Sequence, residues 1–201
     1  MNVLRNRFKV TWLFFTVLAS YYLFGAAFWQ SEYPVLEEVL FFTGVILVAI
    51  GVIGRAWCFS YISGNKDERL IQEGPYSICR NPLYLFSLIG AVGIGFGTET
   101  FVIPGIIAVA FLAYYPFTIR REEAKLKEIF GAEYEAYMKK VPHRLIPSFG
   151  NYIELEEIII SPRAFRRGVF DLLFFIIPLG FCEIVEILRV TGRIPTYFQL
   201  F

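Results

Sequence analysis

Hydrophobic and polar residues are grouped along this chain in long blocks. Five blocks are hydrophobic and 17 to 23 residues long: 10–30, 36–58, 82–98, 100–119 and 168–188. A helix rises about 1.5 Å per residue and the hydrocarbon core of a bilayer is about 30 Å thick, so these lengths suit membrane-spanning helices. We therefore expect an all-α fold, a polytopic membrane helical bundle of about five spans in a single integral-membrane domain over residues 1–201.

The fifth block is the least apolar, because it contains Asp171, Glu183 and Glu186 together with Pro178. Acidic side chains inside a bilayer are costly. This block can cross the membrane or lie as an interfacial or re-entrant helix, and the sequence leaves both open. The third and fourth blocks are separated only by Glu99, which predicts a tight helical hairpin.

Two polar segments, residues 60–81 and 120–150, lie between the hydrophobic blocks. The second contains apolar residues at intervals of three or four positions: Leu126, Ile129, Phe130, Tyr134 and Tyr137. This spacing predicts an amphipathic helix over residues 121–138, interrupted by Gly131 and lying at the membrane interface.

Basic residues are distributed unequally between the segments that connect the blocks. With five spans and the N-terminus inside, 17 of the 19 lysines and arginines fall in inner segments. Positive charge is enriched on the cytoplasmic side of membrane proteins. We therefore expect the N-terminus and both polar segments to face the cytoplasm, in the plasma or inner membrane or in the endoplasmic reticulum.

The composition supports a membrane protein and argues against two other classes. The chain is 56% hydrophobic and 18% charged, its mean hydropathy is +0.55 and its net charge is +1, whereas soluble domains carry about 25% charged residues. The near-neutral charge and the lack of a basic patch argue against a nucleic-acid partner. Three cysteines without CxxC spacing and one histidine argue against a metal site.

The stretch from Glu73 to Tyr84, EGPYSICRNPLY, contains the strongest local signals. Gly74-Pro75 predicts a turn, and Asn81-Pro82 predicts a helix N-cap followed by proline at the first helical position. Arg80 would then lie at the positive end of a helix dipole, where an anionic group of a ligand is stabilised.

The two polar segments together offer the groups that S-adenosylmethionine requires. Arg80 and the helix start could bind its carboxylate, and Glu122 or Glu123 could bind its ammonium. Aromatic rings, which favour a sulfonium, are available at Tyr76, Tyr84, Tyr134 and Tyr137. On residue types alone, an arginine–glutamate pair between two connectors is more often structural, and the glutamates can instead pair with Lys125 to Lys127 on a solvated helix face.

Two motifs resemble those of a known family. GPYSICRNPLY resembles the GPY-x-x-x-R-H-P-x-Y signature of the isoprenylcysteine carboxyl methyltransferase and phospholipid methyltransferase superfamily. REEAKLKEIFGAEYEAYMKKVPHRLIP resembles the family's EE-x-x-L-x-x-x-FG-x-x-Y-x-x-Y-x-x-x-VP ending. The similarity covers residues 50–147. It implies an S-adenosyl-L-methionine-dependent membrane enzyme that methylates a lipophilic small molecule or a lipidated substrate among membrane lipids, with no nucleic acid and no metal.

The resemblance also implies roles for individual residues. Arg80 and Glu122 would be catalytic, with Arg80 near the reacting centre. The cofactor would contact these two and the other motif positions: Tyr76, Asn81, Pro82, Tyr84, Glu123, Tyr137, His143 and Arg144. Two departures concern the substrate: Asn81 replaces the family's histidine, and Phe86 replaces a common glycine.

Several functions remain open at this stage. Carboxyl O-methylation of isoprenylcysteine is the leading expectation, and N-methylation of a phospholipid amine or S-methylation of a thiol are alternatives. An amine acceptor would need a general base, for which Glu122 or His143 are the candidates. A different class, a non-catalytic transport or assembly subunit, is favoured by the acidic fifth block and the glycine-rich hairpin.

Overall fold

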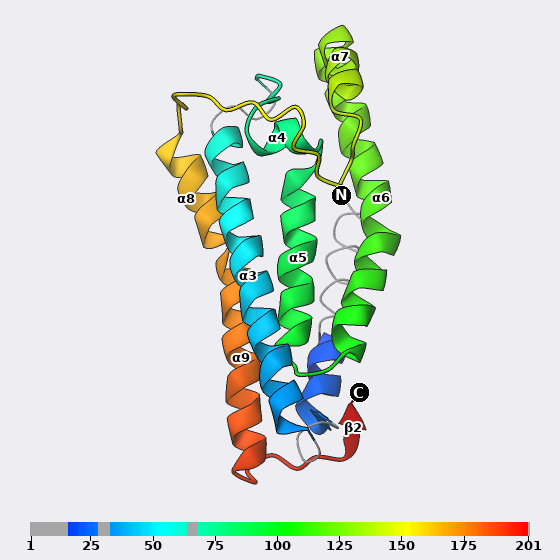
Figure 1. The fold of residues 1–201 in the computed structure, drawn as a ribbon, viewed down its shortest axis with the longest axis vertical. Helices are drawn as coiled ribbons and strands as arrows, with labels where there is room; N and C mark the ends of the chain where they lie inside the picture. Colours follow the sequence, from blue (N-terminus) through cyan, green and yellow to red (C-terminus); the bar gives the residue numbers. More distant parts are fainter. Residues whose placement is uncertain (1–15, 28–32, 64–67, 201) are drawn as a thin grey trace.

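The computed structural model describes residues 16–27, 33–63 and 68–200, and these are mostly helical. Figure 1 shows the arrangement of the elements. In chain order they are β1 (Gly25–Ala27), α3 (Pro34–Ile62), α4 (Pro75–Ile78), α5 (Pro82–Phe96), α6 (Val102–Phe130), α7 (Ala132–Lys140), α8 (Pro162–Phe170), α9 (Leu173–Val190) and β2 (Phe198–Leu200). Residues 16–24 are also helical.

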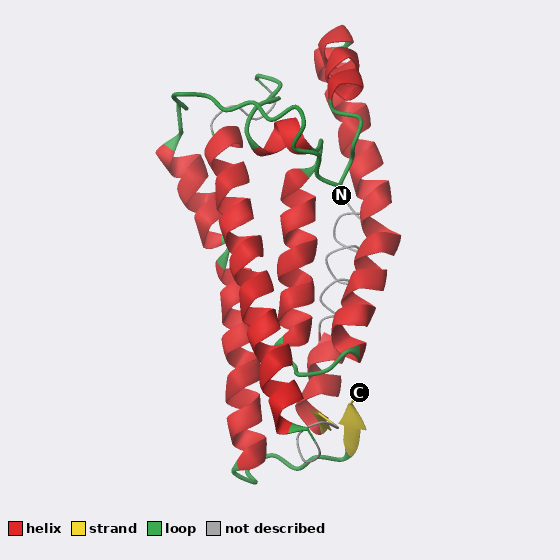
Figure 2. Ribbon diagram, viewed as in Figure 1, coloured by secondary structure: helices red, strands yellow, loops and turns green. Residues whose placement is uncertain are grey.

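The long helices form an elongated bundle with two different ends. α5 lies between α3 and α6, and α8 and α9 run along α3 (Figure 1). We call one end the α7 end, because α4, α7 and long loops gather there (Figure 2). We call the other the sheet end, because β1 and β2 pair there in parallel, Gly25 opposite Phe198.

Helices α3 and α5 approach closely because glycines face each other. A Cβ on Gly51 would lie 2.7 Å from the Gly90 Cα, and one on Gly44 would lie 2.7 Å from the Gly93 carbonyl oxygen. No real Cβ tolerates such distances, so hydrogen is the only side chain that fits. Small residues allow two membrane helices to bring their backbones together and gain dispersion contacts. Gly90 and Gly93 therefore serve the packing of α5 against α3.

Helix α6 differs from the expectation of a span followed by a separate surface helix. It continues without a break from Val102 to Phe130 and stands above the ends of α3 and α5 (Figure 1). Residues 120–130 contain no helix breaker, so the polar sequence extends the apolar one. The helix ends at Gly131, whose φ of +50° suits glycine, and α7 follows. Gly131 therefore separates two helices, as its position in the pattern suggested.

Among the described residues, three helical stretches are long and apolar enough to cross a bilayer: Pro34–Ile62, Val102–Phe130 and Pro162–Val190, the last comprising α8 and α9. α5 is apolar but shorter, with 15 residues. Together these helices mark an integral membrane protein. The count of five spans remains a prediction, since the first block, 10–30, falls partly outside the described residues.

Candidate functional site

A tight turn places Arg80 at the α7 end. Gly74 has a φ of +57°, and a Cβ there would lie 2.2 Å from the Tyr61 ring, so this position requires glycine. The four-residue helix α4 follows, and the chain reaches the start of α5 through extended Cys79. Asn81 occupies the predicted N-cap position and Pro82 the first turn, but the Asn81 side chain makes no capping bond.

Residues 141–153, which we call the return segment, run along this turn and fix it by backbone hydrogen bonds. The Arg80 amide donates to the His143 carbonyl at 2.9 Å and the Asn81 amide to the Arg144 carbonyl at 3.0 Å. Farther along, the amide of Ser148 donates to the Ile78 carbonyl at 2.9 Å. The two motif segments are therefore joined through their main chains.

The Arg80 guanidinium also joins these segments and is largely buried. Its Nε donates to Glu123 Oε1 at 2.9 Å, and its Nη1 donates to the carbonyls of Val141 and Pro142, both at 2.8 Å. Only 7% of the Arg80 side chain is exposed, and 8% of the Glu123 side chain. The sequence led us to expect an anionic ligand beside Arg80. In this structure Arg80 Nε and Nη1 donate instead to groups of the protein itself, the Glu123 carboxylate and two backbone carbonyls.

The Glu123 carboxylate contacts three hydrogen-bond donors. Besides Arg80, its Oε2 lies 3.1 Å from Arg144 Nη2, and its Oε1 lies 3.5 Å from Asn81 Nδ2. We call Arg80, Asn81, Glu123 and Arg144 the Arg80 cluster. A buried carboxylate between two guanidiniums is well compensated. The expected alternative partner on α6, Lys127, instead pairs with Glu135 at 2.7 Å.

Glu122 has a different environment from its neighbour. It is exposed, and its Oε1 accepts a hydrogen bond from the Tyr84 hydroxyl at 2.7 Å. The Tyr84 ring meets the Tyr115 ring edge-on with centroids 5.0 Å apart, and Tyr115 stacks on Phe111. The structure thus separates the glutamate pair into one buried carboxylate and one that faces outward beside an aromatic group.

The remaining tyrosines of the motifs belong to a core. Tyr137 is 3% exposed, and its hydroxyl donates to the Tyr76 carbonyl at 2.7 Å. Tyr134 and Tyr137 pack with Leu70 and Val141. Burial raises the pKa of Tyr134 to about 12 and that of Tyr137 farther, so both phenols stay neutral. The apolar side of the predicted amphipathic helix therefore packs largely against the protein.

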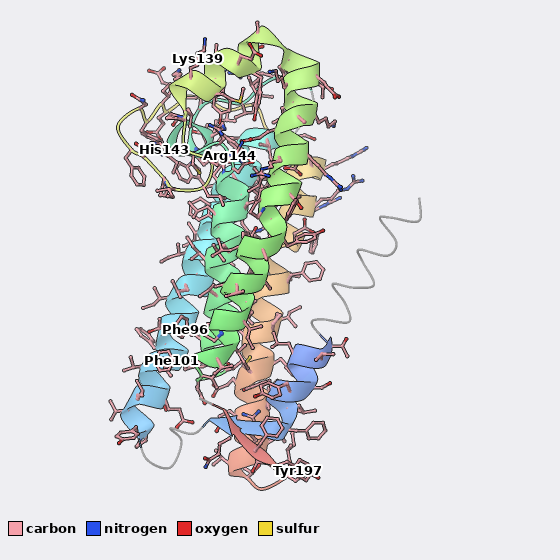
Figure 3. All side chains as sticks on the ribbon, turned by 90° about the vertical axis from the view of Figure 1, so that its right-hand side faces the viewer. Phe96, Phe101, Lys139, His143, Arg144 and Tyr197 are labelled. Atoms are coloured by element: carbon pink, nitrogen blue, oxygen red, sulfur yellow. The ribbon has the colours of Figure 1, made fainter. Side chains whose placement is uncertain are left out.

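His143 and Arg144 lie at the same end, where the return segment passes the start of α5 (Figure 3). Both are exposed, and half of the Arg144 side chain, 51%, remains accessible despite its ion pair. The structure thus brings together Arg80, Asn81, Tyr84, Glu122, Glu123, His143 and Arg144. It places Tyr137 in the supporting core, bonded to the Tyr76 carbonyl.

Sequence reasoning missed one polar contact inside the bundle. Arg55 of α3 donates from Nη1 to Ser87 Oγ of α5, and its guanidinium lies over the rings of Phe59 and Phe175, 5.2 and 5.3 Å from their centroids. The sequence features that could have predicted this contact are Arg55, near the end of the block 36–58, and Ser87, a serine within the block 82–98.

Comparison with known proteins identifies the family. The sequence profile of the phospholipid methyltransferase family matches residues 39–133. The protein-S-isoprenylcysteine O-methyltransferase of Schizosaccharomyces pombe is 32% identical over 102 residues, which cover 49% of this chain and 43% of the relative. The chain belongs to the isoprenylcysteine carboxyl methyltransferase and phospholipid methyltransferase superfamily. No solved structure matches it.

Two further relatives match nearly the full chain. The cobalt-zinc-cadmium resistance protein CzcN of Cupriavidus metallidurans is 32% identical over 90% of this chain and 81% of its own length. The nickel-cobalt-cadmium resistance protein NccN of Alcaligenes xylosoxydans xylosoxydans is 30% identical over 98% of this chain and 90% of its own. Similarity therefore extends beyond residue 147, where the motif resemblance ended.

The two departures from the superfamily signature have visible structural consequences. Asn81 Nδ2 donates to the Arg144 carbonyl at 3.3 Å and approaches Glu123, so an amide donor contributes to the Arg80 cluster. The Phe86 ring fills the space over Gly54, where a Cβ would lie 2.1 Å from Phe86 Cδ1, and it packs near Trp57. The phenylalanine and the glycine of α3 therefore fit each other.

Proposed function

We propose that this protein is an S-adenosylmethionine-dependent methyltransferase that acts on a lipophilic substrate at the membrane. One observation carries the proposal: the 2.9 Å ion pair between Arg80 and Glu123 joins two motif segments that are 43 residues apart in sequence. The pair supports an exposed carboxylate, Glu122, and a half-exposed guanidinium, Arg144.

The donors present fit the amino-acid end of S-adenosylmethionine. Glu122 offers a carboxylate to the cofactor's ammonium, and Arg144 offers exposed donors to its carboxylate. Tyr84 orients the Glu122 carboxylate through the 2.7 Å hydrogen bond. Arg80 and Glu123 would act mainly by holding these groups in place. The bound cofactor supplies an electrophilic methyl group on a sulfonium.

Methyl transfer requires little from the protein except alignment. A lone pair of the acceptor forms a bond to the methyl carbon while the carbon–sulfur bond breaks, and the departing sulfur becomes a neutral thioether. Positioning and a suitable electrostatic environment therefore supply most of the catalysis. The polar α7 end offers a route for the cofactor, and the apolar helices offer lateral access for a lipid.

Carboxyl O-methylation of an isoprenylcysteine is our leading assignment for the acceptor. A carboxylate is already nucleophilic and needs no general base, which agrees with an asparagine at position 81. N-methylation of a phospholipid amine would need a base, for which the exposed residues Glu122 and His143 are the candidates. S-methylation of a lipophilic thiol is the third possibility.

Equilibrium binding of labelled S-adenosylmethionine to the detergent-purified protein tests the proposal. Glu122→Gln should weaken binding at least tenfold, since the ammonium loses its ionic partner. Glu128→Gln makes the same chemical change at an exposed position of α6 and should bind like the wild type. Absence of binding to the wild type, or equal binding by Glu122→Gln, would refute the assignment of the site.

The acceptor is identified by transferring a labelled methyl group to three substrates in detergent micelles. These are an S-prenylated N-acetylcysteine, phosphatidylethanolamine and a long-chain alkyl thiol. Our leading assignment predicts a labelled, base-labile ester on the first. Label on the amine or on the thiol would instead select that acceptor class.

We also propose a role in tolerance of divalent metal ions, because both relatives that match nearly the full chain are named for metal resistance. Growth of cells with and without the gene in cobalt, zinc, cadmium or nickel salts tests this role. If the Glu122→Gln gene restores tolerance as well as the wild type does, tolerance does not depend on methyl transfer. Equal growth without the gene would exclude the role.

A further inference from the structure

Three glutamates meet at the sheet end, far from the Arg80 cluster. Glu37 lies in the first turn of α3, Glu99 in the connector between α5 and α6, and Glu186 near the end of α9. One carboxylate oxygen from each lies within 4.8 Å of the other two. Figure 3 shows Phe96 and Phe101, which flank the Glu99 connector, well separated from His143 and Arg144.

Glu99 is the buried member of this group, which we call the Glu99 cluster. It is 7% exposed, between Thr98 and Thr100, which are 4% and 0% exposed. Its Oε2 is buried and has no hydrogen-bond partner within the described part of the chain. Burying a carboxylate oxygen without a partner is expensive. Glu37 makes a side-chain hydrogen bond to the Glu99 carboxyl group, but no described residue supplies a donor to the buried Oε2.

The nearby positive charge does not balance the cluster. Arg189 Nη1 lies 3.3 Å from Glu186 Oε2, while its Nη2 donates to the Tyr22 carbonyl and its guanidinium lies 4.3 Å from the Tyr22 ring centroid. One arginine thus faces three carboxylates, and Glu183 adds negative charge nearby. With all three glutamates ionised, the cluster and Arg189 together carry a charge of −2, which one divalent cation would cancel.

We propose that Glu37, Glu99 and Glu186 form a binding site for a divalent cation. Carboxylate oxygens bind such ions at about 2.0–2.6 Å, so oxygens within 4.8 Å of one another can share one ion after small side-chain rotations. Oxygen-only donors favour hard and borderline ions such as Mn²⁺, Mg²⁺, Ca²⁺ and Co²⁺. Water would complete the coordination, because Glu37 and Glu186 are only half-buried.

The site would also link three segments of the bundle. Its ligands come from α3, from the α5–α6 connector and from α9, so a bound cation would hold these elements together at the sheet end. The proposal is independent of methyl transfer, and it deepens the proposed role in metal tolerance by naming a site where the protein would bind the ion.

Titration of the purified full-length protein with Mn²⁺ tests the site, because Mn²⁺ binding is detected directly by electron paramagnetic resonance. The wild type should bind one ion at the cluster. Glu99→Gln and Glu37→Gln should each weaken binding at least tenfold. Glu38→Gln, an exposed change next to Glu37, should leave the affinity unchanged.

Two control measurements keep the result interpretable. Bound Mn²⁺ should raise the melting temperature of the wild type and of Glu38→Gln but not that of Glu99→Gln. S-adenosylmethionine binding should be the same in all four proteins, which shows that the variants are folded and separates this site from the methyltransferase proposal. A wild type that does not bind millimolar Mn²⁺, or a Glu37→Gln protein that binds it like the wild type, would overturn the inference.

Discussion

Arg80 illustrates how one side chain can serve a site by organising it. Its donors contact Glu123 and two carbonyls of the return segment, and Glu123 in turn contacts Arg144. The neighbouring Glu122 remains accessible and is aligned by Tyr84. The adjacent glutamates are therefore expected to respond differently to the same substitution.

Glu123→Gln should destabilise the protein by about 3 kcal/mol, because removing one member of a buried ion pair leaves the other charges uncompensated. Thermal unfolding in detergent, followed by circular dichroism, should show a clearly lower melting temperature. Glu122→Gln and Glu128→Gln should unfold close to the wild type. A melting temperature for Glu123→Gln within the scatter of these controls would contradict the structural role.

Cys79 lies next to Arg80, so the reactivity of its thiol measures how well the loop around Arg80 is packed. It is 0% exposed, and burial raises the pKa of its thiol to about 11 although the Asn81 amide and Arg80 lower it. The thiol form therefore persists at mildly alkaline pH, and the stability it contributes is lost as the pH rises from the unfolded value of about 8.5 toward 11.

Alkylation of Cys79 by iodoacetamide, located by mass spectrometry, should be slow at pH 8 and should accelerate about tenfold per pH unit up to pH 10. Arg80→Ala raises the Cys79 pKa by removing a positive charge, but it also removes the loop's ion pair with Glu123, and the resulting exposure of the thiol should accelerate alkylation overall. Fast labelling of the folded wild type at pH 8 would show that the thiol is not protected.

At the scale of elements, two features decide the shape: the glycine contact between α3 and α5, and the unbroken α6. Gly51 and Gly90 allow backbone contact that any Cβ would prevent. α6 extends beyond the other helices, and after α7 the return segment comes back to the start of α5 (Figure 1). That return brings the second motif to the first.

Gly51→Ala should lower stability by about 1–3 kcal/mol, since the added methyl group must push α3 away from α5. Gly180→Ala is the matched control, because Gly180 is also helical and a Cβ there meets nothing within 4 Å. Melting temperatures compare the two variants directly. If both substitutions have the same effect, close helix contact is not what restricts position 51.

At the scale of the whole molecule, the chain places two clusters of opposite character at the two ends of one bundle. The Arg80 cluster has two arginines around one buried glutamate, whereas the Glu99 cluster has three glutamates beside one arginine. If the distribution of basic residues sets the orientation, the α7 end faces the cytoplasm and the sheet end faces the opposite side.

Cysteine labelling with a membrane-impermeant maleimide tests this orientation. The three native cysteines are buried, so the wild type provides the background. Lys139→Cys, on exposed α7, should react only after the membrane is opened, and Thr196→Cys, exposed near β2, should react in intact cells. The reverse pattern would show that the chain is inserted the other way.

The sequence alone determined the helical class, the membrane setting, the superfamily and the two segments that meet at the α7 end. These follow from block length, hydropathy and local turn chemistry, which act between neighbours in the chain. It could not distinguish Glu122 from Glu123, show that Arg80 is buried, or place Tyr137 in a core, because adjacent residues of a helix face different surroundings only after packing.

Tertiary structure alone decided which distant charges become partners. Glu37, Glu99 and Glu186 lie far apart in the sequence, and their proximity arises from the packing of α3, α5, α6 and α9. Local patterns fix where helices form because their energies depend on nearby residues. Contacts between charges depend on how the helices pack, and that is set by the bundle as a whole.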